Sequence, residues 1–255
     1  MSKILRKIRA GRVVFAVVYT PCTAGDSPKA RAQKQKASTA AREKLNARTS
    51  FQKLERTLAA NFDDGDLFVP LTYDDKHLPD GRDKAVRKIR SFLSKLRKAR
   101  AERGEELHYI YVTEGACPGG RLHHHLVLNS TGDDLEEIRQ LWIYGDNVEL
   151  RRLAFHRDYT YEDLASYLTK EPREWGHPQV GERTWTPSLG LRRPEAETET
   201  VPDCVTLAAP PEAETLAREG PVVNGYGEFA WIKYMLPKTD KNKRPRSRRR
   251  RRKKE

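Results

Sequence analysis

The stretch that decides the fold is Gly120-Arg-Leu-His-His-His-Leu-Val-Leu-Asn129. It is a short apolar run, opened by the turn residues Pro118-Gly-Gly120 and closed by Asn129-Ser-Thr-Gly132, and this pattern predicts a β-strand. Side chains alternate between the two faces of a strand, so His123 and His125 project from one face and His124 from the other. Two imidazoles about 7 Å apart along a strand can converge on one metal ion.

A second expected strand lies just upstream and ends in a carboxylate, His108-Tyr-Ile-Tyr-Val-Thr-Glu114. A hairpin between the two strands would bring Glu114 beside His123 and His125. Two histidines and one carboxylate would then bind a metal and leave coordination positions open. The pattern has a plainer interpretation, in which the histidines form a polar strand face or an incidental metal-binding tract.

Composition restricts the classes of protein that need to be considered. A chain of 255 residues can bury one substantial core, and 37% hydrophobic against 33% charged residues leaves room for tails and loops. The sequence has no apolar run of membrane-spanning length and no signal peptide, so we expect no membrane partner. Cys22, Cys117 and Cys204 form no Cys-x-x-Cys pair, which favours a reducing cytoplasm over a disulfide framework or a zinc finger.

The net charge of +13 is concentrated at the two ends of the chain. Residues 238–255 contain twelve Lys or Arg and two acidic residues, and residues 1–60 contain fourteen and three. The ends therefore carry +10 and +11, so residues 61–237 carry −8 of the total. Basic ends favour binding to a phosphate backbone, and an acidic body favours a cation site. The run at 248–254 is equally typical of a disordered basic tail or a localisation signal.

Hydrophobic periodicity predicts an α+β fold, with one mostly antiparallel sheet and helices packed on its other face. The expected domains are a basic strand and helical region at 1–60, a catalytic domain at 61–194, an acidic flexible insertion at 195–220, a terminal ordered segment at 221–237, and a disordered basic tail at 238–255. The expected strands are 12–19, 67–73, 107–114, 122–129, 148–155 and 226–236, and the expected helices are 29–61 (one or two), 83–103, 133–142 and 161–170. Pro70 predicts an edge position or a bulge for its strand.

The helix at 161–170 carries a second set of chemical groups. Tyr167 and Lys170 are three residues apart and share one face of the helix, with Asp163 one turn earlier. A phenol with an ordinary pKa of about 10 is a weak nucleophile at neutral pH, and a nearby lysine and divalent cation would favour its ionised form. A single tyrosine on a helix is more commonly just a residue at the edge of the core.

The order of these motifs resembles that of the HUH endonucleases that initiate rolling-circle replication in phages and plasmids. The resemblance covers residues 61–194 and depends on the whole ordered set. Its motifs are Leu71-Thr-Tyr73, Tyr111-Val-Thr-Glu-Gly115, Gly120-Arg-Leu-His-His-His125, Leu141-Trp142 and Tyr167-Leu-Thr-Lys170.

The resemblance implies a fold and a set of functional residues. The fold is a five-stranded antiparallel sheet flanked by helices, the RRM-like palm of HUH endonucleases. His123 and His125 would bind Mg²⁺ or Mn²⁺, with Glu114 as the candidate third ligand. Tyr167 would be the nucleophile, and Lys170 would help to position phosphate and metal.

Two residues depart from the family pattern. The middle residue of the His-x-His triplet is usually bulky and hydrophobic, but here it is His124, which leaves open a register in which His124 also reaches the metal. Many phage members carry a second tyrosine where this chain has Glu171. Tyr159 or Tyr161 could replace it, although their spacing does not match, so we expect a reaction with one tyrosine.

The expected protein is a replication initiator that nicks and rejoins single-stranded or hairpin origin DNA, leaving a 5′-phosphotyrosine and a free 3′-OH. It would act in the cytoplasm of a bacterial host, with helicase and polymerase from the host. The alternatives are a plasmid mobilisation relaxase, a tyrosine (HUH) transposase, or a non-catalytic DNA-binding protein with the same fold. Phage or plasmid origin, the origin sequence and the oligomeric state stay open.

Overall fold

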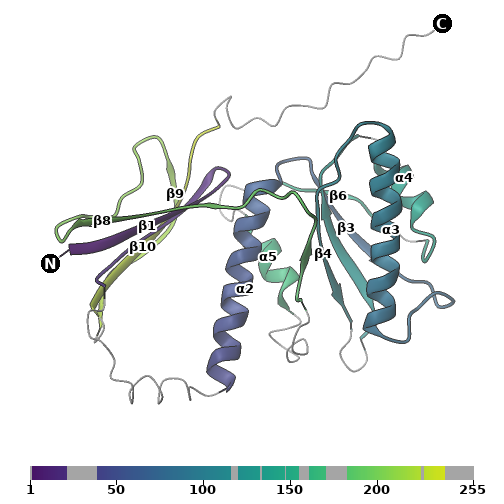
Figure 1. The fold of residues 1–255 in the computed structure, drawn as a ribbon, viewed down its shortest axis with the longest axis horizontal. Coiled ribbons are helices and arrows are strands. Elements are labelled where there is room, and N and C mark those ends of the chain that lie inside the picture. Colours follow the sequence, from purple (N-terminus) through teal and green to yellow (C-terminus); the bar gives the residue numbers. More distant parts are fainter. Residues whose placement is uncertain are drawn as a thin grey trace, which may run out of the picture. The chain divides into compact units, whose positions relative to one another are not determined.

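The computed structural model describes residues 2–21, 39–115, 120–132, 134–146, 148–154, 161–170, 183–224 and 227–238. Contacts divide the chain into two compact units, each assembled from separate stretches of sequence (Figure 1). Unit 1 comprises Met1–Asp63, Phe155–Thr184 and Leu191–Pro237. Unit 2 comprises Asp64–Ala154, Trp185–Gly190 and Lys238–Glu255. None of the helices in the described part of the chain is both long enough and apolar enough to cross a membrane.

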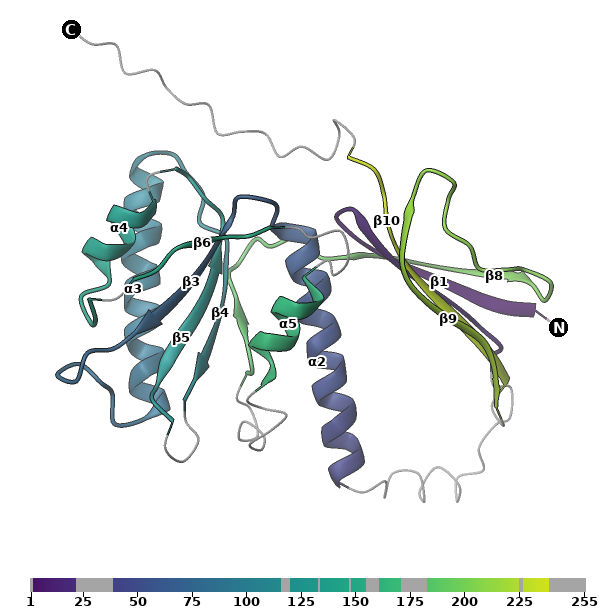
Figure 2. The same cartoon turned by 180° about the vertical axis from the view of Figure 1, so that it is seen from behind.

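Unit 2 is built on an antiparallel sheet with the strand order β6-β3-β5-β4-β7. Its strands are β3 (Leu67–Thr72), β4 (Tyr109–Glu114), β5 (His123–Leu128), β6 (Arg151–Arg152) and β7 (Thr186–Pro187). Figure 2 shows β3, β5 and β4 side by side, as their pairing requires. The hairpin expected between the strand that ends at Glu114 and the strand that carries the histidines is therefore present.

Helices α3 (Arg82–Glu102) and α4 (Asp134–Leu141) cover one face of this sheet. The apolar residues of α3 that face the sheet are all buried: Ala85, Ile89, Phe92, Leu93 and Leu96. In α4, Ile138 is buried and Leu141 packs against the core, but Leu135 is exposed. The helix turns Asp134 toward the interior, so the buried stripe passes through Asp134 and Ile138, and Leu135 lies about 100° away from it.

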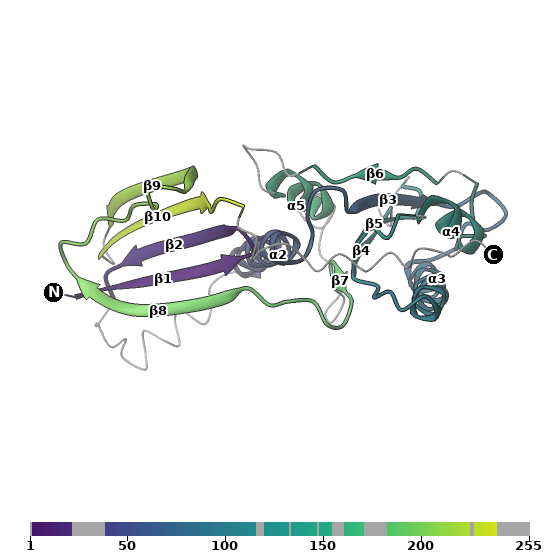
Figure 3. The same cartoon turned by 90° about the horizontal axis from the view of Figure 1, so that it is seen from above.

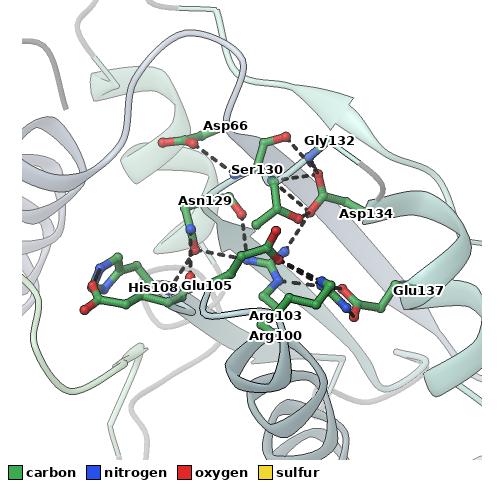
Figure 4. A network of polar contacts seen from close by, with 12 residues as sticks. Asp66, Arg100, Arg103, Glu105, His108, Asn129, Ser130, Gly132, Asp134 and Glu137 are labelled. Atoms are coloured by element: carbon green, nitrogen blue, oxygen red, sulfur yellow. Dashed lines mark hydrogen bonds and ion pairs between the residues drawn. The ribbon is translucent and has the colours of Figure 1, made fainter. Parts of the chain in front are cut away.

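A buried ion pair fixes the connection between β5 and α4 (Figure 4). Arg100, in the last turn of α3, donates from Nη2 to Asp134 Oδ1 at 2.7 Å and from Nη1 to the Asn129 carbonyl oxygen at 2.9 Å. Asp134 also accepts backbone N–H groups from Thr131 and Gly132. Burial alone would raise the pKa of Asp134, but these hydrogen bonds and the Arg100 charge together lower it. The carboxylate is therefore held in its ionised form.

The edge strand β6 is shorter than the sequence predicts. A strand is expected at 148–155, whereas β6 contains only Arg151 and Arg152, with an isolated bridge between Leu71 and Val148. Pairing between β3 and β6 ends at Phe68, so Pro70 has no registered partner in β6. Because proline has no N–H to donate, it can occupy this sparsely paired side of β3 without loss of a ladder hydrogen bond.

Unit 1 contains a second five-stranded antiparallel sheet, with the order β8-β1-β2-β10-β9. Figure 3 shows these strands in this order, from β9 to β8. Its elements are β1 (Ser2–Ala10), β2 (Val13–Tyr19), β8 (Glu195–Pro202), β9 (Glu214–Asn224), β10 (Gly227–Met235), α2 (Thr39–Asn61) and α5 (Glu162–Leu168). The predicted α+β class is confirmed, but the fold contains two such sheets rather than one, and the strand expected at 12–19 belongs to the second.

Residues 195–202 and 214–224 form the edge strands β8 and β9, where the sequence predicts a mobile acidic insertion at 195–220. The strand β8 pairs with β1 along Ser2–Arg9, which brings Glu197 opposite Lys7 and Glu195 opposite Arg9. Lys7 Nζ also lies 3.5 Å from Glu199 Oε1. The composition of β8 would by itself indicate disorder. This acidic strand is paired with the basic strand β1, and opposite charges across a ladder are stabilising. The predicted basic tail lies, except for Lys238, outside the described residues.

Candidate metal centre

The three predicted metal ligands meet on one face of the unit 2 sheet, opposite the face covered by α3 and α4. Antiparallel pairing places Glu114 directly across from His123, and His125 follows two residues later on the same face. The ligand atoms of all three side chains lie within 4.8 Å of one another. Glu114 and His125 are almost fully buried, and His123 is partly exposed.

The distances within this group fit one shared ion. His123 Nε2 lies 3.1 Å from His125 Nε2, and Glu114 Oε2 lies 3.3 Å from His125 Nε2 and 3.7 Å from His123 Nε2. Two atoms that each lie about 2.1 Å from one ion, at right angles, are about 3 Å apart. Two imidazoles and one carboxylate suit a first-row divalent metal with open positions, so the residues present fit the expected cofactor class.

Neighbouring groups orient the two imidazoles. His123 Nδ1 lies 2.9 Å from the Arg121 carbonyl oxygen, and a carbonyl can only accept, so this nitrogen carries the proton. The Nε2 lone pair of neutral His123 is then directed to the ligand group, as in metal sites where the second ring nitrogen is hydrogen-bonded. The ring of His125 stacks on Phe68, with centroids 5.5 Å apart.

His124 lies on the other face, which excludes the register in which it joins the metal ligands. It is fully buried, with Nε2 2.6 Å from the Tyr73 hydroxyl and Nδ1 2.9 Å from Thr113 Oγ1. Burial lowers the pKa of His124 to about 3, so the ring is neutral at physiological pH. His124 thus fills a core position, and it does so with both nitrogens satisfied.

A glycine completes the end of β4 beside the ligand group. Gly115 follows Glu114 directly and has a φ of +89°. A Cβ at this position would lie 2.0 Å from the Arg121 carbonyl oxygen, so the close approach of the two strands excludes any side chain. The same carbonyl accepts from His123, and Gly115 therefore supports the position of a ligand as well as the turn.

Two arginines that the sequence analysis did not single out lie at this end of the sheet. Arg121 donates to the Tyr73 carbonyl oxygen at 2.8 Å and pairs with Asp75. Arg82, at the start of α3, donates to the Thr113 carbonyl oxygen at 2.5 Å. Both contacts are made within one residue of the ends of β3 and β4, where a phosphate bound at the ligand group would need compensating charge. Arg121 lies in the stretch Gly120–Asn129, two residues before His123, and this spacing is the feature of the sequence that could have indicated its place near the ligands.

Tyr167 and Lys170 belong to unit 1, on and just after α5. Tyr167 is 42% exposed, and Lys170 Nζ lies 4.0 Å from the centroid of its ring, so the two do share one side as predicted. The carboxylate of Glu162, at the first position of α5, pairs with Lys233 of β10 at 2.7 Å. The other partner of Lys233 is the buried Glu55 of α2. This arrangement ties the helix that carries Tyr167 to the rest of unit 1.

The two other candidate tyrosines differ in how far the structure describes them. Tyr161 is buried and lies at the start of α5 with a φ of 59°. A buried phenol in this position is poorly suited to attack DNA. Tyr159 and Glu171 lie outside the described residues. The predicted site residues therefore come from both units, and the structure brings together the three metal ligands within unit 2.

Comparison with known proteins gives one match. Residues 66–172 match the model of a family of replication-associated proteins, the ORF2 family. The matched range includes the three ligand residues as well as Tyr167 and Lys170. No curated protein and no solved structure matches the chain. The match supports a role in replication initiation, and the Glu-His-His group fits a metal site.

Proposed function

We propose that this protein initiates rolling-circle replication by nicking and rejoining single-stranded origin DNA through a covalent tyrosine intermediate. The observation that carries the proposal is the convergence of Glu114, His123 and His125 on one position. The family match over residues 66–172 supports it, because the matched segment contains this group together with the candidate nucleophile.

The ligand group has a definite part in this chemistry. Glu114, His123 and His125 would hold Mg²⁺ or Mn²⁺, which supplies Lewis-acid polarisation of a phosphate oxygen. Hydrogen bonding to the Arg121 carbonyl oxygen keeps the His123 Nε2 lone pair available as a ligand. Arg121, two residues before His123, would add positive charge for the DNA backbone.

Tyr167 is the proposed nucleophile. Its phenol oxygen would attack the scissile phosphorus and lose its proton, while the bond from phosphorus to the 3′ oxygen breaks and that oxygen takes up a proton. The products are a 5′-phosphotyrosine and a free 3′-OH, and attack by a 3′-OH on the phosphotyrosine reverses the reaction. Lys170, 4.0 Å from the Tyr167 ring centroid, supplies a cation beside the developing phenolate.

The direct test is a search for a covalent adduct. The full-length protein is mixed with Mn²⁺ and a single-stranded DNA library with a randomised central segment, and adducts are separated on denaturing gels. We expect an adduct with the parent protein and with Tyr161→Phe, and none with Tyr167→Phe. An adduct that persists in Tyr167→Phe and disappears in Tyr161→Phe would assign the nucleophile to the other tyrosine.

A second test addresses the metal without relying on activity. Electron paramagnetic resonance detects free Mn²⁺, so its loss on addition of protein measures binding. We expect His123→Ala and Glu114→Gln to abolish stoichiometric binding, and His108→Gln, a change at the opposite end of β4, to leave it intact. Equal binding by all three variants would place the ion elsewhere. A parent protein that binds DNA without forming an adduct would favour the non-catalytic alternative.

A further inference from the structure

The sheet of unit 1 carries a partly exposed face rich in aromatic residues. Cross-strand pairing sets Tyr19 of β2 opposite Phe229 of β10, and Val17 opposite Trp231. Residues paired directly across a ladder point to the same side of the sheet, so the three rings share one face. We call this surface, formed by Tyr19, Phe229 and Trp231, the aromatic face; all three side chains are partly exposed.

The aromatic face is not the core face of this sheet. The core lies on the opposite side, where Leu5, Val14, Ala16 and Val18 pack with Ile232 and Tyr234, and where Leu207, Ala209 and Ala213 cover them. Helix α2 covers only one end of the aromatic side, where Glu55 bonds to Lys233 and Arg56 lies over Phe15. The rings of Tyr19, Phe229 and Trp231 are two or more residues further along their strands.

Two arginines adjoin this face. Arg6 is exposed and pairs with Val17, which places it in the same cross-strand row as Trp231. The Arg56 guanidinium lies 4.9 Å from the centroid of Phe15, and its buried Nε has no hydrogen-bond partner among the described residues. Burial lowers the pKa of Arg56, the Glu55 carboxylate opposes this effect, and the charge of Arg6 adds to it. Arg6, exposed in the row of Trp231, is the guanidinium better placed for an anion, and Arg56 adds positive charge beside it.

One carboxylate lies among these groups, and it has a specific contact. Glu219 Oε2 accepts the Trp231 indole N–H at 2.7 Å. This bond holds the indole in a fixed orientation, which lowers the entropic cost of stacking a ligand on it. Two further carboxylates, Glu55 and Glu162, lie at the α2 end of this side, and both pair with Lys233.

We propose that the aromatic face binds single-stranded DNA, with bases stacked on Tyr19, Phe229 and Trp231 and phosphates held by Arg6 and Arg56. Stacking on aromatic side chains beside a basic track is the general means by which proteins bind unpaired strands. Duplex DNA hides its base faces and cannot use such a surface. The aromatic face lies outside the matched residues 66–172, so the proposal does not depend on the nicking chemistry.

The test measures affinity of the full-length protein for fluorescent oligo-dT by anisotropy, with EDTA present to remove metal from the Glu-His-His group. Salt of about 0.3 M suppresses non-specific binding by the basic ends of the chain. Trp231→Leu and Phe229→Leu remove rings but keep apolar side chains in the strand. Arg6→Gln has a matched control in Arg9→Gln, because both arginines are exposed on β1 but Arg9 pairs with Val14 on the opposite face.

We expect Trp231→Leu to weaken binding about tenfold, and Arg6→Gln to weaken it less, while Arg9→Gln binds like the parent. Competition by oligo-rU tests whether the face prefers DNA or binds any unpaired strand. Competition by duplex DNA tests whether it recognises charge alone. Equal competition by duplex, or equal affinity of all variants, would overturn the proposal. A sedimentation shift from dimer to monomer in Trp231→Leu would also overturn it, by showing that the face contacts a second copy of the chain.

Discussion

The two sheets have the same number of strands and the same antiparallel pairing, yet they differ in what occupies the face away from the core. In unit 2 that face carries two histidines and a carboxylate that converge on one position. In unit 1 it carries three partly exposed rings spread over two strands. A metal site needs a few ligand atoms at fixed distances from one point, whereas a surface on which bases stack needs several rings spread over a larger area. The comparison shows that two sheets of one fold class expose different chemical groups, because the alternation along two neighbouring strands decides which side chains share a face.

The ion pairs of the two units differ in the same way. Arg100 and Asp134 fasten α3 to a loop at the end of the unit 2 sheet, remote from the ligands along β5. Lys233 of unit 1 lies within a strand, on the aromatic side, and joins Glu55 of α2 and Glu162 of α5. We therefore expect loss of the first to affect stability alone, and loss of the second to affect stability and the Tyr167 helix together.

The largest expected effect is that of Asp134→Ala on the stability of unit 2. The change leaves the buried Arg100 guanidinium without its closest acidic partner, which costs about 3–5 kcal/mol in the free energy of unfolding. Urea denaturation followed by fluorescence measures it. Glu149→Gln, which alters the exposed contact with Arg151 in the same unit, is the control and should cost about 1 kcal/mol or less.

The same carboxylate predicts a pH dependence. The folded-state pKa of Asp134 is lowered, so its contribution to stability is present above the unfolded value, near 4, and is lost as pH falls through the folded value. Parent stability should therefore decline below pH 4 more steeply than that of Asp134→Ala. Parallel curves for the two proteins would show that Asp134 is not ionised in the fold.

Lys233→Met should destabilise unit 1 by about 3 kcal/mol, because it leaves Glu55 buried without its cation. Burial already raises the pKa of Glu55 against the opposing effect of Lys233, and the variant should raise it further. A raised folded-state pKa gives stability that is present below the unfolded value, near 4.3, and is lost as pH rises through the folded value. The variant should thus be most stable in acid.

The double change Lys233→Met, Glu55→Leu is the control for this experiment. It removes both charges from the interior and should recover most of the stability, since a buried pair can be replaced by apolar groups at little cost. Adduct formation by Tyr167 should stay low in the double variant if the bond from Lys233 to Glu162 positions α5. Full activity there would show that α5 is held by packing alone.

The parts of the fold that the sequence predicts correctly depend on residues close together in the chain. Alternation places His123 and His125 on one face, and a short hairpin adds Glu114 across the ladder. The proximity of Tyr167 and Lys170 likewise follows from helical spacing. Each of these inferences needs only the side-chain periodicity of one strand or helix, or a short loop between two neighbouring strands.

The incorrect predictions depend on partners distant in the sequence. Residues 195–202 lack the apolar alternation of a strand, and only the basic partner β1, nearly two hundred residues earlier, stabilises them as one. The roles of Tyr73 and Thr113 beside His124 require the register of three strands. Arg100 follows Leu96 by four residues and lies on the buried face of α3, but its acidic partner Asp134 is 34 residues further along the chain. No local pattern contains this information.

Metal binding should stabilise one unit and not the other. Mn²⁺ at about one hundred times its dissociation constant should add about 2.7 kcal/mol to the unfolding free energy. Hydrogen exchange followed by mass spectrometry should show slower exchange in β4 and β5, with β1 and β2 unchanged. His125→Ala should abolish the effect. Equal protection of both sheets by Mn²⁺ would indicate binding away from the Glu-His-His group.

The smallest effect is expected at the residues that support His124 from the core side. Tyr73→Phe removes the hydroxyl that lies 2.6 Å from His124 Nε2, and burial of this phenol already raises its pKa, so the group is a neutral donor in the fold. Loss of one buried hydrogen bond should cost about 1–3 kcal/mol. Because the change acts on the helix side of β5, Mn²⁺ affinity should fall far less than in His123→Ala. Titration of both variants with Mn²⁺ measures the difference. An equal loss of Mn²⁺ affinity in both would mean that residues on the helix side of β5 matter for metal binding as much as the ligands on its other face.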